Sequence, residues 1–299
     1  STIYRDIMQK VNPNDFDCIH PTTLFSDGGV AYHIWKHYQK PYIVAVRNTD
    51  VNTFMRYAPY AWNVGRNILL NASKIIFISK ALKDSFCRHI MIKDILPDIM
   101  DKIIIQPNGI DEYWIEHIRS DKISNDSILY VGRFDSNKNV LRLMRSVIQL
   151  KSAYPTIKLN LVGGYGNQLK RVLKLVEKYP ELFYYHGIVS DKEKLTQLYL
   201  SNRIFAMPSK HETFGLVYIE ALSQNLSLLY TKGQGIDNFF DFNIGIAVNP
   251  HSVSDIKNAL ESLLNNNNIN NDQVDFSMFS WHNIAKKYAS IYQEICMLS

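Results

Sequence analysis

The segment spanning residues 204–224 constrains the fold of this 299-residue chain more than any other. Residues 204–207 form an apolar run with the length of a buried strand, and residues 215–224 form an apolar helical run after a short polar loop. Glu212 lies in that loop, and Glu220 follows eight positions later inside the helical run. Ligands of open α/β sheets bind outside the carboxyl ends of the strands, and helix N-termini favour phosphate. The segment therefore predicts a ligand site that carries two carboxylates.

Strand-like and helix-like runs alternate through the rest of the chain, which is typical of an α/β protein with parallel sheets and crossover helices. The expected strands cover residues 16–19, 42–46, 74–78, 102–105, 127–131, 157–162, 182–185, 204–207 and 226–230. The expected helices cover residues 27–38, 58–70, 80–89, 138–151, 167–178, 192–200, 215–224, 253–264 and 281–295. Ser79 is the expected N-cap of the third helix. We interpret residues 111–125 as a polar linker and residues 265–271 as an Asn-rich surface loop.

Composition excludes several classes of protein. Hydrophobic residues make up 46% of the chain and charged residues 20%, as in ordinary globular proteins. The net charge of +5 is not accompanied by a nucleic-acid-binding motif. The three cysteines, Cys18, Cys87 and Cys296, lack metal-ligand spacing and suit a reducing cytosol. No apolar run reaches about 18 residues and no signal peptide is visible, so we expect a cytoplasmic protein, with weak attraction to anionic lipid left open.

Further loops carry residues suited to a phosphate group. Arg133 closely follows the expected strand 127–131, and Lys138 lies at the start of the next helix. Arginine can bind two phosphate oxygens at once and lysine supplies a point charge, so together they could bind a phosphate group. A glycine-rich run at residues 163–166 follows the next strand. By itself this run fits a plain turn equally well.

Glu212-x7-Glu220, Gly132-Arg133 with Lys138, and the turn at residues 107–111 together resemble the motifs of the family 4 retaining glycosyltransferases, also called glycosyl transferases group 1. The resemblance covers most of the chain and implies the GT-B fold, in which two Rossmann-like domains face a cleft. It implies an acceptor-side domain over residues 1–115, a nucleotide-sugar-binding domain over residues 116–280, and a C-terminal helix over residues 281–299 that crosses back to the first domain. Family members usually open with a strand, a Gly-rich loop and a helix, which we do not find here. We therefore expect the first domain to be incomplete.

The resemblance implies roles for the charged residues. Arg133 and Lys138 are implied to neutralise the diphosphate, and Glu212 is implied to contact the donor hexose near its hydroxyls or its anomeric centre. These three are the expected catalytic residues. Glu220 is implied to accept hydrogen bonds from the ribose hydroxyls, because a carboxylate can accept two at once.

The remaining contacts to the donor are implied to come from the main chain and from small residues. The amides of Phe214, Gly215 and Leu216, at the expected helix start, are implied to hold the hexose or the distal phosphate. Gly164 belongs to the glycine-rich run, and Ile188 lies in the neighbourhood that recognises the base in the family. Both are expected to line the substrate site.

The first domain matches the family less closely. Many members have a histidine after the strand that corresponds to residues 42–46, where this chain has Arg47. Arg47 could contact a phosphate or an acidic acceptor, and Asp50 could position an acceptor hydroxyl; alternatively the two form an internal salt bridge. His20 fits a structural histidine. The aromatic run at residues 54–62 fits a hydrophobic core, with contact to an acceptor lipid or the membrane surface as the alternative.

The implied function is that of a retaining, metal-independent hexosyltransferase. We expect no cofactor, a UDP-sugar as donor, and a saccharide or lipid-linked acceptor in surface polysaccharide or glycolipid synthesis. Peripheral contact with the inner membrane face would be compatible with that role. Two alternatives stay open, a sugar-nucleotide epimerase of GT-B fold and a non-catalytic nucleotide-sugar-binding module. Interconversion of sugars without an acceptor would identify the first, and donor binding without turnover the second.

Overall fold

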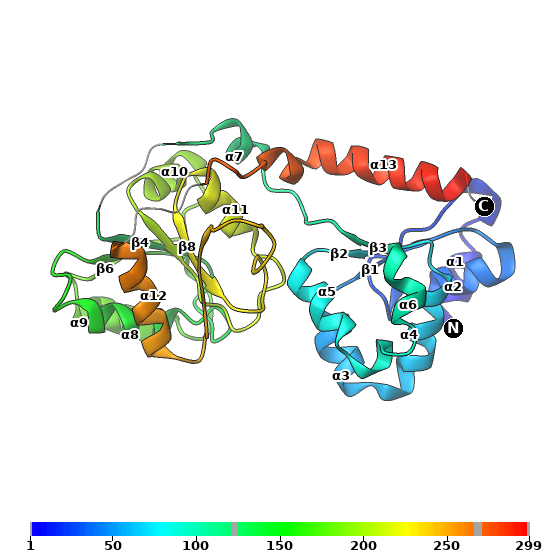
Figure 1. Ribbon diagram of the computed structural model, residues 1–299, viewed down its shortest axis with the longest axis horizontal. Coiled ribbons are helices and arrows are strands. Elements are labelled where there is room, and N and C mark those ends of the chain that lie inside the picture. Colours follow the sequence, from blue (N-terminus) through cyan, green and yellow to red (C-terminus); the bar gives the residue numbers. More distant parts are fainter. Residues whose placement is uncertain (1, 121–124, 266–270, 298–299) are drawn as a thin grey trace. The chain divides into compact units, whose positions relative to one another are not determined.

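The computed structural model describes residues 2–120, 125–265 and 271–297, and it divides into two compact units. Unit 1 comprises Ser1–Gly109 together with Trp281–Ser299, and unit 2 comprises Ile110–Ser280. Each unit contains a parallel sheet with helices beside it (Figure 1). The α/β class and the parallel sheets predicted from the sequence are confirmed. The division after Gly109 lies before the expected boundary at residue 115.

The sheet of unit 1 has three parallel strands in the order β1-β2-β3. They are β1 (Ile43–Val46), β2 (Lys74–Phe77) and β3 (Ile103–Ile105). The strand expected at residues 16–19 is wrong, because Ile19 forms only an isolated parallel bridge to Tyr42. Pro21 has no N–H with which to continue that ladder towards β1, although its carbonyl accepts a bond from the Ala45 amide.

Helices and short helical turns make up most of the rest of unit 1. The α-helices are α1 (Thr2–Met8), α2 (Asp27–Tyr38), α3 (Met55–Tyr57), α4 (Trp62–Asn71), α5 (Lys80–Cys87), α6 (Leu96–Ile99) and α13 (Trp281–Met297). The 3-10 turns are η1 (Pro13–Asp15), η3 (Pro59–Ala61), η4 (Ile90–Ile92) and η5 (Met100–Lys102), and η2 (Asp50–Phe54) is a π-helix. The side chain of Ser79 accepts from the Leu82 amide, so the predicted N-cap is confirmed.

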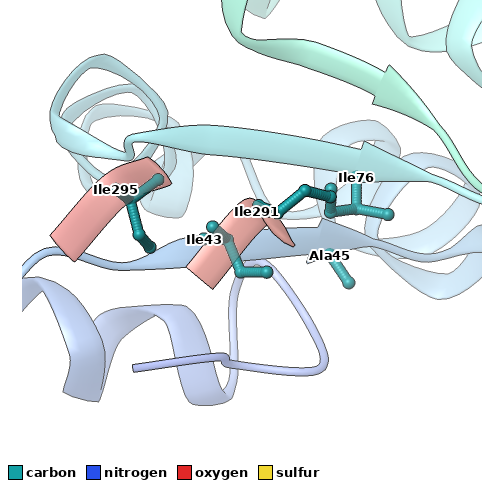
Figure 2. Close-up of a cluster of buried hydrophobic side chains, with 5 residues drawn as sticks. All are labelled: Ile43, Ala45, Ile76, Ile291 and Ile295. Carbon is teal, nitrogen blue, oxygen red and sulfur yellow. The ribbon is translucent and has the colours of Figure 1, made fainter. Parts of the chain in front are cut away.

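Helix α13 packs on the sheet of unit 1. Its residues Ile291 and Ile295 join Ile43, Ala45 and Ile76 in one buried cluster, and Figure 2 shows the two helix side chains directed at β1 and β2. The pattern of apolar residues along the C-terminal segment therefore corresponds to a helix face that covers this sheet.

The sheet of unit 2 has six parallel strands in the order β6-β5-β4-β7-β8-β9. They are β4 (Ser127–Val131), β5 (Lys158–Val162), β6 (Phe183–Gly187), β7 (Ile204–Ala206), β8 (Ser227–Thr231) and β9 (Gly245–Val248). Strand order runs outward from β4 to one edge and from β7 to the other, so the topological switch point lies between β4 and β7. The loops that follow these two strands flank the position where open α/β sheets bind ligands.

Seven helical segments accompany this sheet in the described part of unit 2. They are α7 (Glu112–Glu116), α8 (Val140–Leu150), α9 (Leu169–Lys178), α10 (Lys192–Leu200), α11 (Leu216–Ser223), α12 (Val253–Asn265) and η6 (Phe276–Phe279). Across the two units, none of the helices in the described ranges combines the length and apolar character that a membrane span requires.

Two expectations for unit 2 are corrected by the structure. The segment interpreted as a linker at residues 111–125 contains α7, which begins because the Asp111 carboxylate caps the Tyr113 amide. The strand β9 was not predicted, because it is short and opens with Gly245, a residue that is rare in strands. Residues 121–124 of the linker and 266–270 of the Asn-rich loop lie outside the described residues.

Candidate functional site

The loop after β4 carries the two predicted cations, and a buried tyrosine holds its start. Tyr130, the penultimate residue of β4, donates from its hydroxyl to the carbonyl of Arg133 at 2.7 Å. Burial raises the pKa of this hydroxyl far above its ordinary value of 10.0, so it remains a donor. This bond holds the start of the loop against β4, while the Arg133 side chain is exposed.

The glycine-rich run after β5 lets this loop pack main chain against main chain. Gly163 has φ of +146°, and a Cβ atom there would lie 2.0 Å from the carbonyl oxygen of Gly132. The Phe134 amide donates to the Tyr165 carbonyl at 2.6 Å, and the Gln168 amide donates to the Phe134 carbonyl at 2.8 Å. The glycines are thus required by close approach of two loops, a more specific role than that of a plain turn.

Asp135 links the Arg133 side chain to the main chain at Asn137 and Lys138. One of its carboxylate oxygens accepts from the backbone amides of Asn137 at 3.0 Å and Lys138 at 2.8 Å. The other lies 3.5 Å from Nε of Arg133. Sequence analysis missed Asp135. An aspartate that accepts from the backbone amides two and three positions later in the chain forms an Asx turn, which is a local sequence signal.

Asn137 joins the loop after β4 to the loop after β7. Its side-chain amide donates to the carbonyl of His211 at 2.9 Å, and its side-chain oxygen accepts from the His211 amide at 3.0 Å. Its own carbonyl accepts from the Lys210 amide at 2.7 Å. The residue was not predicted, since its partners lie 74 positions away in the sequence.

The joined loops bring Lys138 and Glu212 together. Lys138 Nζ lies 2.6 Å from Glu212 Oε2, and the two side chains are 24% and 12% exposed. The loop after β8 supports the glutamate from its other side: the Gly235 amide donates to the Glu212 carbonyl at 3.0 Å, and Gln234 Oε1 accepts from the Glu212 amide at 3.3 Å. Three loops therefore fix the position of this carboxylate.

The start of α11 lies directly after this carboxylate. Gly215 has φ of +83°, and a Cβ atom there would lie 2.5 Å from the ring of Tyr218, so the helix entry requires glycine. The helix begins at Leu216, so Glu212 precedes it as predicted. The Phe214 side chain is buried against the rings of Phe239 and Phe279, which leaves only its main chain for the predicted ligand contact.

Glu220 lies one turn inside α11, and its side chain has a different partner from those of the Lys138–Glu212 pair. Its carboxylate accepts from the Tyr199 hydroxyl at 3.2 Å, and the Tyr199 ring meets Trp114 edge-on at 5.3 Å. Burial raises the pKa of Glu220 above its ordinary value of 4.5, an effect that the bond from Tyr199 opposes and the nearby Asp111 carboxylate reinforces. The contact with a buried tyrosine was not predicted.

The predicted substrate residues Gly164 and Ile188 meet at the carboxyl ends of β5 and β6. A Cβ atom at Gly164 would lie 2.6 Å from Cγ1 of Ile188, and the Ile188 side chain is exposed. Tyr165, next to them, is exposed as well. The structure thus brings both residues to the edge of the sheet that bears Arg133.

In unit 1 the structure gives Asp50 a different role from the predicted one. Asp50 is 1% exposed, and its carboxylate accepts from the backbone amides of Leu24, Phe25 and Arg47. It is therefore a structural residue, because no face of the carboxylate remains open to an acceptor hydroxyl. Arg47 donates from Nε to the Thr22 carbonyl at 3.0 Å, so its guanidinium lies at the carboxyl end of β1.

His20 is held by helix α13. Its Nδ1 atom lies 2.7 Å from the Tyr292 hydroxyl, and its ring contacts the rings of Tyr288 and Tyr292. Burial lowers the pKa of His20, and the neighbouring Arg47 charge lowers it further. These contacts agree with the structural histidine expected from the sequence. Within the described residues, no group of three or more His, Cys, Asp or Glu side chains is arranged to hold a metal ion.

Comparison with known protein families identifies the family to which these loops and strands belong. The model of the family described as glycosyl transferases group 1 matches residues 116–277, which is more than half of the chain. The chain belongs to the group 1 glycosyltransferases. The match covers the strands, loops and helices that carry Arg133, Lys138, Glu212 and Glu220.

This group 1 glycosyltransferase is similar to several curated proteins. An uncharacterised glycosyltransferase of Methanocaldococcus jannaschii is 26% identical over 244 residues, which are 74% of this chain and 60% of that protein. The D-inositol 3-phosphate glycosyltransferase of Corynebacterium kroppenstedtii is 24% identical over 279 residues, which are 84% of this chain and 60% of that protein. The chain thus spans about 60% of the length of these relatives.

Solved structures of known glycosyltransferases share the fold. HepE of Anabaena, solved in complex with UDP, superposes with a TM-score of 0.74 at 16% identity, covering 98% of this chain and 82% of that chain. Sucrose-phosphate synthase of Thermosynechococcus elongatus superposes with a TM-score of 0.68 at 21% identity, covering 99% of this chain and 77% of that chain. These similarities confirm the GT-B fold that was predicted from the sequence.

Proposed function

We propose that this group 1 glycosyltransferase belongs to family 4 and transfers a hexose from a UDP-sugar to an acceptor hydroxyl, with retention and without a metal ion. The observation that carries the proposal is the convergence of Arg133, Lys138 and Glu212 at the switch point of the unit 2 sheet. The UDP complex of HepE supports uridine as the nucleoside.

The two cations stabilise the leaving group. When the anomeric C–O bond breaks, negative charge collects on the diphosphate, and fixed donors aimed at that charge lower the barrier. Arg133 is exposed and its guanidinium can bind two phosphate oxygens, while Lys138 adds a second charge from the same loop. Asp135 contacts the Arg133 guanidinium and accepts from the backbone amide of Lys138, which ties both residues into one turn.

Retention follows a front-face route. The acceptor oxygen forms its bond to the anomeric carbon on the face from which the diphosphate leaves, and a diphosphate oxygen takes the acceptor proton. In this proposal Glu212 contacts the hexose and stabilises positive charge on the ring, while Glu220 accepts from the ribose hydroxyls. The amides of Phe214, Gly215 and Leu216 hold the hexose or the distal phosphate, and Ile188 with Gly164 lines the base site.

Unit 1 contributes the acceptor side in this proposal. Arg47 is the remaining predicted residue there, and its guanidinium suits a phosphorylated or acidic saccharide or lipid-linked acceptor. We place the reaction in the synthesis of surface polysaccharide or glycolipid at the cytoplasmic face of a membrane.

Isothermal titration of the full chain with UDP tests the donor site. Arg133→Ala should weaken UDP binding about tenfold or more, as for a lost charged hydrogen bond, whereas the exposed Arg171→Ala on α9 should leave it unchanged. Equal affinities for both variants, or no UDP binding by the wild type, would count against the proposal. Hydrolysis of UDP-sugars should survive EDTA, and activity that returns only with Mn²⁺ would refute the metal-independent mechanism.

A further inference from the structure

Two of the three cysteines lie where helix α13 packs on unit 1. Cys18 belongs to the segment before α2, and Cys296 lies in the last turn of α13. Both side chains are half-buried, and both pack against the buried cluster of β1, β2 and α13 that Figure 2 shows. The two thiols therefore share one site, although nearly the whole chain separates them in sequence.

The segment around Ile19 is extended. Ile19 bonds to the chain at the start of β1 through both its amide and its carbonyl, each at 3.0 Å. Side chains alternate between the two faces of an extended segment, so Cys18 and His20 lie on the face opposite to Ile19. That face meets α13, because His20 Nδ1 lies 2.7 Å from the Tyr292 hydroxyl.

The spacing along these two segments places the cysteines opposite each other. Two positions along an extended segment cover about 6.6 Å, and four positions along a helix cover about 6 Å. The step from His20 to Cys18 therefore matches the step from Tyr292 to Cys296. The thiols give the direction of this match, because the Cys18 thiol donates to the sulfur of Cys296.

We propose that Cys18 and Cys296 form a reversible disulfide that fastens the last turn of α13 to unit 1. A disulfide joins sulfur atoms about 2 Å apart on side chains that point at each other. Thiols that are already in hydrogen-bond contact need only a small movement to reach that distance. The third cysteine, Cys87, lies at the end of α5 and is left outside the pair.

A small disulfide, such as glutathione disulfide, is the oxidant. The thiolate is the attacking form of cysteine. Burial and the adjacent Cys296 raise the pKa of the Cys18 thiol to about 11, so its thiolate is scarce, and we assign the first attack to Cys296. The Cys296 thiolate forms a mixed disulfide with one glutathione and releases the other as a thiolate.

The second step is intramolecular, which favours it despite the scarce thiolate. Cys18 gives up its proton, and its sulfur attacks the Cys296 sulfur. This attack forms the Cys18–Cys296 bond, breaks the bond to glutathione and releases the second glutathione thiolate. Two protein thiols are thereby oxidised to one disulfide, while one glutathione disulfide is reduced to two glutathione thiols.

The bond acts at a helix end that noncovalent contacts hold on unit 1. These contacts include the buried Ile295 side chain and the ion pair between Lys74 and Glu294 at 2.8 Å. Exposed ion pairs contribute little to stability, and the last turns of helices fray. A covalent bond at Cys296 opposes this fraying, so the thiol–disulfide state sets how firmly the end of α13 is held.

Mass analysis of the full chain tests whether the bond forms. The reduced protein is treated with glutathione disulfide, and its remaining thiols are alkylated under acidic denaturing conditions. We expect one alkylated thiol, at Cys87, together with one peptide pair linked through Cys18 and Cys296. Dithiothreitol should restore three alkylated thiols. Glutathione that stays on either residue of the pair, a bond that includes Cys87, or three unreacted thiols would overturn the proposal.

Single serine variants assign the roles of the cysteines. Cys18→Ser should keep glutathione on Cys296, whereas Cys296→Ser should take up at least about tenfold less glutathione, because the Cys18 thiolate is scarce. Cys87→Ser is the matched control and should form the disulfide as the wild type does. The opposite labelling in the first two variants would contradict the order of attack. Circular dichroism melting checks that each variant is folded.

Hydrogen exchange measures what the bond does to α13. Oxidation should slow the exchange of amides at residues 292–296 about tenfold or more and raise the unfolding midpoint by about 5 °C, in the wild type and in Cys87→Ser. Cys18→Ser with glutathione on Cys296 should show neither change. An oxidised wild type that exchanges and melts like the reduced protein would contradict a fastened helix. No donor is used in these measurements, so they stand apart from UDP binding.

Discussion

Lys138 and Glu212 lie on loops that follow β4 and β7, on the two sides of the switch point in the unit 2 sheet, and their side chains pair at 2.6 Å. The pair couples the residue proposed to bind the diphosphate with the residue proposed to bind the hexose. A diphosphate that enters the site competes with Glu212 for the Lys138 charge. The ion pair therefore keeps both side chains ordered and partly desolvated before a donor arrives.

Replacement of Lys138 by methionine tests this coupling. Lys138→Met removes a cation from the proposed diphosphate site, and we expect UDP affinity to fall by about 1–3 kcal/mol, the usual cost of a lost charged hydrogen bond. Isothermal titration measures the change, with Lys151→Met as the control because Lys151 pairs with Glu181 elsewhere in unit 2. Unaltered affinity in Lys138→Met would remove this residue from the site.

Asn137 is expected to affect the same site only by positioning the loop that carries Glu212. Asn137→Ala removes both side-chain bonds to His211 and should loosen the loop that carries Glu212. We expect UDP affinity to fall about tenfold, since small displacements of a binding loop are costly. Asn258→Ala on the exposed side of α12 is the control. If the thermal midpoint falls while UDP affinity stays constant, the residue is structural only.

Local sequence patterns predicted most of the secondary structure. Helix α2 has the predicted bounds, Ser79 is the predicted cap, and the loop with Glu212 precedes α11 as expected. These features depend on residues within one or two turns of each other, so the sequence displays them directly.

Features that depend on distant partners were not predictable in this way. The sequence neighbours of Asp50 suggested a salt bridge to Arg47, whereas two of its three amide donors come from residues 24 and 25, in the loop before α2. Likewise the partner of Glu212 lies 74 positions away. The strand expected at residues 16–19 had a suitable pattern, but it forms only the Ile19–Tyr42 bridge, because Pro21 has no N–H to donate the next bond to β1. The periodicity of apolar residues along the sequence does not predict such tertiary contacts.

Gly163 should tolerate no side chain. Gly163→Ala would place a methyl group 2.0 Å from the Gly132 carbonyl at φ of +146°, so the two loops must separate. We expect a loss of about 2 kcal/mol or more in the free energy of unfolding, from strain and lost loop contacts. Gly29→Ala in α2 is the control, because a Cβ atom there meets nothing within 4 Å. Equal melting curves for the two variants would contradict the close approach.

Asp50 is expected to matter for stability and not for acceptor binding. Asp50→Ala leaves three backbone amides without their acceptor, and an unpaired buried donor costs about 1–3 kcal/mol. We therefore expect unit 1 to lose about 3 kcal/mol or more, measured by urea unfolding. The exposed Asp101→Ala serves as the control. A fully stable Asp50→Ala protein that has lost only transfer activity would restore the acceptor role.

The raised pKa of Glu220 makes stability depend on pH in a definite direction. Burial favours the protonated carboxyl in the folded chain, so between the ordinary value of 4.5 and the raised value the folded state binds more protons than the unfolded state. Stability contributed by this group is therefore present at low pH and is lost as pH rises through the raised pKa. Glu220→Gln removes the titration and retains an oxygen that can accept from Tyr199. Unfolding midpoints measured from pH 7 down to about pH 5 should show the wild type gaining stability relative to Glu220→Gln as the pH falls. A constant difference, or one that changes in the opposite direction, would show that Glu220 is solvated like an ordinary surface glutamate.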